Sequence, residues 1–217
     1  MDIVLTNPPF GGREEDSIET NFPKHFQTRE TADLFLALII RVLKPEGRAA
    51  VVLPDGSLFG EGVKMRLKEH LMEECNLHTI VRLPNSAFKP HASIGANLLF
   101  FEKGVPTKDI WFYKHRVPDE QKAYSMTRPI RVEHLKPCVD WWGGPKRKGK
   151  VETEVAWKVA IDEVKSRGYN LDIINPHIVQ DNHGDPEELL ARFTEAEGQT
   201  GALRNQLKAI LTEALLR

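Results

Sequence analysis

Short apolar runs alternate with longer segments of helical spacing along the first half of the chain. Each run is rich in branched apolar residues and is bounded by Pro, Gly or Asn, which predicts a buried β-strand. The runs lie at residues 2–6, 48–53, 78–83, 96–102 and 109–115. Apolar residues that recur every three or four positions predict helices at 32–44 and 63–74. Thr31 suits the N-cap of the first helix, and Pro45 with Gly47 ends it.

This alternation of buried strands and helices predicts the fold class. It favours an α/β fold with a mostly parallel sheet. The stretch between the strands at 78–83 and 96–102 is too short for a crossover helix, so we expect those two strands to pair as an antiparallel hairpin. Residues 11–30 are polar, with scattered Gly and Pro, and are expected to form a long loop of the kind that is usually functional or disordered.

The pattern changes after about residue 117. Residues 118–184 are predicted to be a loop-rich extension with one helix at 154–167, whose apolar face is formed by Val155, Val159, Ala160 and Val164. Residues 185–217 return to helical spacing, although Gly198 and Gly201 weaken the middle of that helix. We therefore expect three parts, 1–117, 118–184 and 185–217, with the last one docking on a partner.

Composition and charge narrow the function classes. Hydrophobic residues make up 41% of the chain and charged residues 28%, which is typical of a soluble globular protein. The net charge of −1 predicts that any nucleic-acid contact comes from local patches or from a partner. The basic run 146–150 is expected to be a solvated loop, with phosphate contact as the alternative, and Trp141 with Trp142 is expected to pack locally, with a partner or DNA as the alternative.

Other features of the sequence concern the cellular compartment and metal binding. The chain has no apolar run long enough to span a membrane and no secretory leader, so a cytoplasmic protein is expected. Cys75 and Cys138 are far apart in sequence and are interpreted as structural thiols. The eight histidines show no pair at ligand spacing, so no metal is expected.

The run Asn7-Pro8-Pro9-Phe10 follows the first predicted strand, at the end where open α/β sheets bind ligands. The exocyclic amine of adenine is a poor nucleophile because its lone pair is delocalised into the ring. The side-chain carbonyl of Asn7 and the backbone carbonyl of Pro8 can accept hydrogen bonds from that amine, and these bonds strengthen as positive charge develops. Pro8 and Pro9 fix the turn and remove competing N–H groups. Phe10 offers a face on which a base taken out of a duplex can stack. We interpret all four residues as catalytic.

Longer segments around this turn resemble a known family. These segments are 7–11, Ala32-Asp33-Leu34-Phe35-Leu36, 43–54, Val81-Arg82-Leu83-Pro84 with Phe88, 94–101 and Tyr169-Asn170-Leu171. Together they resemble the modification (M) subunit of type I restriction-modification systems, strongly so over residues 1–116. The resemblance implies the C-terminal half of a Rossmann-like methyltransferase sheet, followed by C-terminal helices.

The resemblance also implies an activity, a cofactor and partners. It implies methyl transfer from S-adenosyl-L-methionine to adenine N6 in DNA, in a complex with a specificity (S) subunit that reads the sequence and a restriction (R) subunit. Asn7 would also contact the cofactor, and Phe88 would pack near the flipped base, with plain core packing as its alternative. Similar turns occur in enzymes that methylate RNA guanine or protein glutamine, which the surrounding segments argue against.

The chain departs from the family's pattern in one respect. Family members carry a glycine-containing cofactor loop well upstream of the catalytic turn, whereas only Met1 and the first strand precede the turn here. We therefore expect this chain alone neither to bind the cofactor well nor to methylate DNA. The alternative function is a truncated, non-catalytic M subunit that still assembles with the S subunit. The first strand would lie at an exposed sheet edge, which invites self-association.

Overall fold

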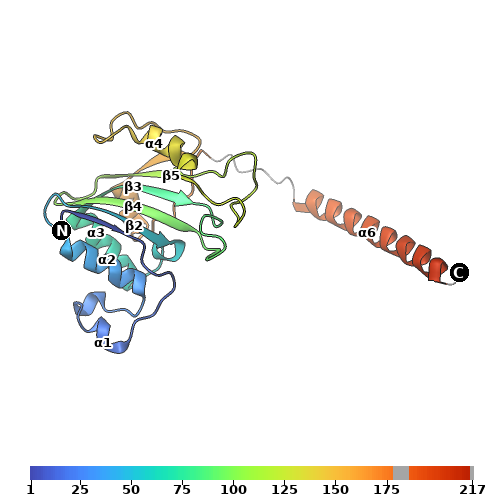
Figure 1. Ribbon diagram of the computed structural model, residues 1–217, viewed down its shortest axis with the longest axis horizontal. Helices are drawn as coiled ribbons and strands as arrows, with labels where there is room; N and C mark the ends of the chain where they lie inside the picture. Colours follow the sequence, from blue (N-terminus) through green and yellow to red (C-terminus); the bar gives the residue numbers. More distant parts are fainter. Residues whose placement is uncertain (178–185, 216–217) are drawn as a thin grey trace. The chain divides into compact units, whose positions relative to one another are not determined.

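The computed structural model describes residues 1–177 and 186–215 (Figure 1). The chain divides into two compact units, Met1–Ile178 and Val179–Arg217, which are described separately. The first unit is built on one six-stranded sheet with the order β1-β2-β4-β3-β5-β6. Its strands are β1 (Ile3–Thr6), β2 (Arg48–Pro54), β3 (Cys75–Leu83), β4 (Ala96–Lys103), β5 (Asp109–Lys114) and β6 (Ala156–Ala160).

The strand directions match the α/β prediction. β1 pairs with β2 and β3 with β5 in parallel, whereas β4 runs antiparallel between β2 and β3. The strands β1, β2, β3 and β5 therefore share one direction, and β4 and β6 oppose it. The predicted antiparallel hairpin is confirmed as β3 and β4, and the carboxyl ends of β1, β2, β3 and β5 meet at one edge of the sheet.

Two helices cover one face of the sheet, α2 (Thr31–Val42) and α3 (Val63–Glu74) (Figure 1). Their apolar faces pack on inward-facing strand residues to form the main core, in which Leu71, Leu77 and Ile80 are completely buried. Burial of this kind supplies the main driving force for folding. Helix α2 starts at Thr31 with Glu30 as the N-cap residue, and no side chain caps it, so the prediction that Thr31 is the N-cap was wrong by one position.

The opposite face is covered by the segment around α4 (Lys136–Trp142), which follows the 3-10 turn η3 (Val132–Leu135). Trp142 packs edge-on against Phe100, with ring centroids 4.7 Å apart, and Trp141 packs on Tyr113 at 5.1 Å. The two tryptophans therefore pack locally, as expected from the sequence.

The helix predicted at 154–167 was wrong over its first half. Residues Ala156–Ala160 form strand β6, and helix α5 covers only Ile161–Ser166. Trp157 and Val159 both point into the main core, and the Trp157 ring stacks on Phe112 of the neighbouring strand at 5.3 Å. Residues two positions apart in a strand face the same side, so Trp157 and Val159 are both buried in the core. This burial favours the strand over the helix that the spacing of the valines predicted.

The long segment after the Asn7–Phe10 turn is also more ordered in structure than a plain loop. It contains the short helix α1 (Asp16–Glu19) and the 3-10 turn η1 (Lys24–Phe26), whose Phe26 is buried against α3. A second 3-10 turn, η2 (Asp55–Ser57), follows β2. Cys75 and Cys138 are buried free thiols, in agreement with their interpretation as structural cysteines.

The second unit contains helix α6 (Pro186–Leu215), which runs through Gly198 and Gly201 without a break. Its large apolar side chains are 40–66% exposed within the structure. They are Leu189, Leu190, Phe193, Leu203, Leu207, Ile210 and Leu211. None of the helices in the described ranges is long and apolar enough to cross a membrane.

Candidate active site

The Asn7–Phe10 turn lies at the carboxyl edge of the sheet, immediately after β1. Pro8 is buried and anchors the turn, whereas Asn7 is exposed. Within residues 1–177 and 186–215, the Asn7 side chain has no hydrogen-bond partner, so its carbonyl oxygen is free to accept a bond from a ligand. The turn therefore presents this carbonyl oxygen at the surface, and its role as an acceptor for a substrate stays a prediction.

The Phe88 ring contacts the Phe10 ring at this edge of the sheet. Phe88 lies in the segment between β3 and β4, 78 positions along the chain from Phe10, yet the two ring centroids are 5.6 Å apart and the rings are nearly perpendicular at 87°. Phe10 is only partly buried, so the pair faces the surface and does not fill the core. Two aromatic rings beside an exposed amide are a suitable surface for a planar base.

The exit of the turn is fixed to the start of α2. The Thr31 amide donates to the Gly12 carbonyl oxygen at 3.1 Å, and the Glu14 amide donates to the Arg29 carbonyl oxygen at 2.8 Å. A Cβ on Gly12 would lie 2.7 Å from Thr31 Oγ1, so the close approach requires glycine there.

Three charged groups link the start of α2 to α3. Lys64 Nζ contacts Asp33 Oδ2 at 2.8 Å and Glu30 Oε2 at 2.6 Å. Asp33 is almost completely buried, and burial raises the pKa of its carboxyl. Lys68 is 2% exposed and donates to the Leu58 carbonyl oxygen at 3.0 Å, and burial, followed by the charge of Lys64, lowers the pKa of its ammonium group to about 8.

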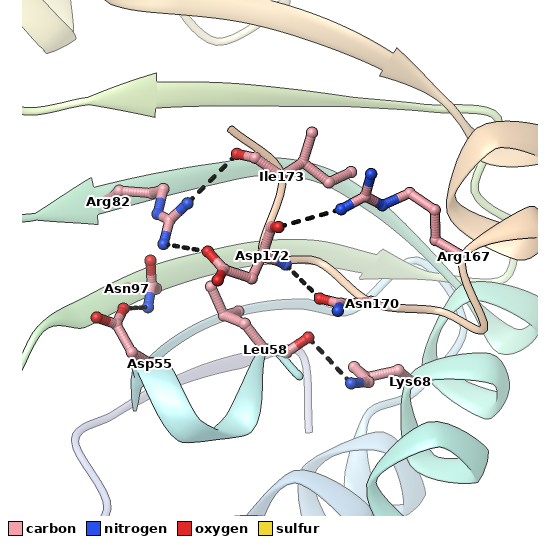
Figure 2. Close-up of polar contacts among 9 residues, drawn as sticks. All are labelled: Asp55, Leu58, Lys68, Arg82, Asn97, Arg167, Asn170, Asp172 and Ile173. Atoms are coloured by element: carbon pink, nitrogen blue, oxygen red, sulfur yellow. Dashed lines mark hydrogen bonds and ion pairs between the residues drawn. The ribbon is translucent and has the colours of Figure 1, made fainter. Parts of the chain in front are cut away.

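A second polar cluster lies at the same edge, around the carboxyl ends of β2 and β3 and the start of β4 (Figure 2). Asn97 Nδ2 donates to Asp55 Oδ1 at 2.7 Å, and Arg82 Nη2 pairs with Asp172 Oδ1 at 2.7 Å. Arg82 Nη1 also donates to the Ile173 carbonyl oxygen. A cavity of about 310 Å³ opens beside this cluster, lined by Asp55, Arg82, Leu83, Pro84, Asn85, Lys114, His115, Trp157, Ile174 and Asn175. No pattern in the sequence points to this cavity, because its residues come from five separate segments.

The basic run at 146–150 is only partly a solvated loop. Arg147 contacts His78 Nε2 at 2.9 Å and Glu102 at 3.2 Å. Lys150 donates to Thr79 Oγ1 at 2.6 Å and lies over the Trp141 and Trp142 rings at 4.7 and 4.4 Å. These two cations therefore bind the protein itself.

Comparison with known proteins places this geometry in a family. Residues 1–185 match the model of the family described as N-6 DNA Methylase. The chain belongs to the N-6 DNA methylase family. It is 56% identical over 217 residues to the EcoEI type I restriction enzyme methylase subunit of Escherichia coli, covering 99% of this chain and 44% of that protein. It is 34% identical to the EcoKI methylase subunit of E. coli K12, covering 75% of this chain and 32% of that protein.

Solved structures of type I modification subunits are also similar to this N-6 DNA methylase chain. One is a modification subunit of a putative type I restriction enzyme from Vibrio vulnificus, with a TM-score of 0.74 and 45% identity over 81% of this chain and 38% of the other. A chain from a study of complex assembly in a type I system has a TM-score of 0.77 and 37% identity over 98% and 45%. The resemblance found in the sequence is therefore confirmed, and the chain spans less than half the length of these relatives.

Proposed function

We propose that this chain supplies the catalytic turn for transfer of a methyl group from S-adenosyl-L-methionine to N6 of adenine in DNA, as the C-terminal part of a type I modification subunit. The observation that carries the proposal is the exposed Asn7 amide beside the Phe10–Phe88 pair, at the carboxyl edge of a sheet that belongs to the N-6 DNA methylase family.

The turn would act on the adenine amine. The Asn7 side-chain carbonyl and the Pro8 backbone carbonyl accept its two N–H groups, which favours a localised lone pair on nitrogen. Both bonds strengthen as positive charge develops on that nitrogen. A proton leaves the nitrogen after methyl transfer, so no carboxylate is needed at the turn. Phe10 and Phe88 would separate to hold the base, because perpendicular rings 5.6 Å apart leave no room for it between them.

The residues present fit part of a cofactor site. Asn7 offers a free amide at the end of β1, whereas the run Gly60-Glu61-Gly62 is separated from the end of β2 by the 3-10 turn η2 and leads into α3. When bound, S-adenosyl-L-methionine supplies an electrophilic methyl group. We expect this chain alone to bind it weakly, and micromolar binding in isothermal titration would contradict that expectation.

The test uses the chain together with the segment that carries the cofactor loop and with a specificity subunit. Transfer of labelled methyl groups into unmodified DNA is expected with the parent, and Asn7→Ala is expected to lower its rate at least a hundredfold, because a lone charge-stabilising donor or acceptor in an active site contributes about that much. Asn21→Ala is the matched control, because Asn21 is exposed and bonds only to nearby backbone oxygens of Ser17 and Ile18. Equal rates for Asn7→Ala and the parent would exclude the proposed role.

The substrate is tested in the same assay. Unmodified RNA and protein replace the DNA, because similar turns act on guanine and glutamine amines. Methyl transfer into either of them, and not into DNA, would favour the alternative substrate class. A complex that assembles but transfers no methyl group to any of the three would favour the non-catalytic assembly role.

Partner binding is proposed for α6. Its seven large apolar side chains are exposed within the structure, and such a stripe is typical of a helix that docks on other helices. We propose that it docks on the specificity subunit and that a restriction subunit joins the resulting complex. Removing residues 186–217 should abolish capture of the specificity subunit, whereas unchanged capture would assign that contact to another surface. Self-association through the edge strand β1, whose Ile3 and Leu5 are exposed, also stays a proposal.

A further inference from the structure

The start of α2 supports the catalytic turn from behind. Gly12 follows Phe10 by two residues, and its carbonyl oxygen accepts a bond from Thr31, the first residue of α2. Thr31 is itself buried, and there is no space for a side chain on Gly12 beside it. A shift of the first turn of α2 would therefore displace the residues that follow the catalytic turn.

Lys64 is the link that fixes this first turn of α2. Its ammonium group joins Glu30, which precedes the helix, to Asp33, in the first turn. The side chain of Lys64 is 19% exposed and that of Asp33 is 5% exposed, so water competes weakly for this pair. A salt bridge with so little exposure constrains geometry far more than a pair at the surface does.

The neighbouring cation does not replace Lys64. Lys68 lies near Asp33, but its ammonium group is held by the Leu58 carbonyl oxygen. Removing Lys64 would therefore leave the Asp33 carboxyl buried without its ion pair, so that it either takes up a proton or moves towards water, and in both cases Glu30 and Asp33 are no longer joined through one cation.

We propose that Lys64 is a positioning residue for methyl transfer, which acts through Asp33 and Glu30 on the start of α2 and through the Thr31–Gly12 bond on the catalytic turn. This inference rests on the proposed function. Misplacement of a reacting group by about 1 Å can cost about a hundredfold in rate. For a partial displacement we expect a loss of about tenfold in the single-turnover methyl-transfer rate of Lys64→Met, with DNA affinity unchanged.

The first experiment needs no activity. Amide hydrogen exchange of Thr31 and Glu14 is measured by NMR in the full 217-residue chain. Lys64→Met should speed exchange at both amides about tenfold, while amides of β3 keep their protection. Lys64→Arg, which can still reach both carboxylates, should restore the protection. Lys136→Met is the matched control, because it removes an exposed pair with Asp140. Unchanged exchange in Lys64→Met would overturn the inference.

The second experiment measures single-turnover methyl transfer and DNA affinity with the reconstituted complex. A tenfold loss of rate in Lys64→Met with rescue by Lys64→Arg supports the positioning role. An unchanged rate, or a loss that follows DNA affinity or global unfolding, overturns it. If the parent complex methylates no DNA, the proposed function fails, and the exchange experiment still decides whether Lys64 holds the turn.

Discussion

Acid is expected to destabilise this protein through His78, which lies at the irregular position of β3 between Leu77 and Thr79. Arg147 donates to His78 Nε2 at 2.9 Å, so Nε2 must be unprotonated and the ring proton sits on Nδ1, which faces Thr79 Oγ1 at 2.9 Å. Burial lowers the pKa of His78 from 6.5 to about 3, and the charges of Arg147 and Lys150 add to the effect. Protonation would put a second cation against Arg147.

The size of the effect follows from the two pKa values. The unfolded chain takes up the proton near pH 6.5 and the folded chain only near pH 3, so the stabilisation is complete above pH 6.5 and is lost as the pH falls towards 3. At about 1.4 kcal/mol per pH unit, the loss between pH 6.5 and 4.5 has a ceiling of about 2.7 kcal/mol. Partial exposure of the ring reduces this loss, and we expect the free energy of unfolding to fall by about 2 kcal/mol. With a urea m-value of about 2 kcal/mol/M, the midpoint shifts by about 1 M.

The assay compares urea unfolding at pH 7.0 and pH 4.5 for the parent and for His78→Gln, which keeps a neutral donor and acceptor. The parent midpoint should fall by about 1 M more than that of His78→Gln. His91→Gln is the matched control because His91 is exposed, and it should behave like the parent. An equal fall in the parent and in His78→Gln would refute the reasoning, as would a His78 ring titration near pH 6.5 by NMR.

Two further predictions concern buried or aromatic groups. Burial lowers the pKa of Lys68 from 10.5 to about 8, so the unfolded chain binds the extra proton between these values and stability should rise with pH from about 8 to 10.5. In the parent, the free energy of unfolding measured with urea should rise by a value on the order of 2 kcal/mol over this pH range, and Lys68→Met should lack this rise. An equal rise in the parent and in Lys68→Met would contradict the prediction. Phe88→Ala should weaken methyl transfer about tenfold to a hundredfold through lost base stacking of roughly 1–3 kcal/mol, and Phe88→Tyr should retain it. Single-turnover rates check this, and an equal loss in both variants would argue for core packing.

Local patterns were enough to predict the parts of this molecule that depend on local chemistry. The turn at Asn7–Phe10 was predicted because two prolines end a strand by removing backbone donors, whatever lies around them. Helix α3 was predicted with its observed bounds because its apolar spacing is regular and glycine precedes it. Strand β6 was missed because Val155, Val159 and Val164 also fit the spacing of a helix, although only Val159 lies in the strand. The core contact of Trp157 with Phe112 decides in favour of the strand.

The second polar cluster at the carboxyl edge of the sheet was not predictable in the same way. Asp55 follows β2, Asn97 lies in β4 and Asp172 lies beyond α5. No neighbouring residue in the sequence indicates the partner of any of them. Each pair can be identified only when the order of the strands in the sheet is known. The contact of Phe88 with Phe10 has the same origin, although resemblance to a family pointed to Phe88.

The positions of the positively charged side chains determine which of them are available to bind DNA phosphates. The basic run at 146–150 has two of its four cations, Arg147 and Lys150, engaged with groups of the protein, which leaves only Lys146 and Lys148 exposed. With a net charge of −1, this run therefore adds little to phosphate binding. Under the proposed function the turn and the aromatic pair hold one base, but affinity for the duplex needs several phosphate contacts. If the assembled subunits supply those contacts, as the proposed function requires, the activity of the complex and the docking of α6 should be lost together.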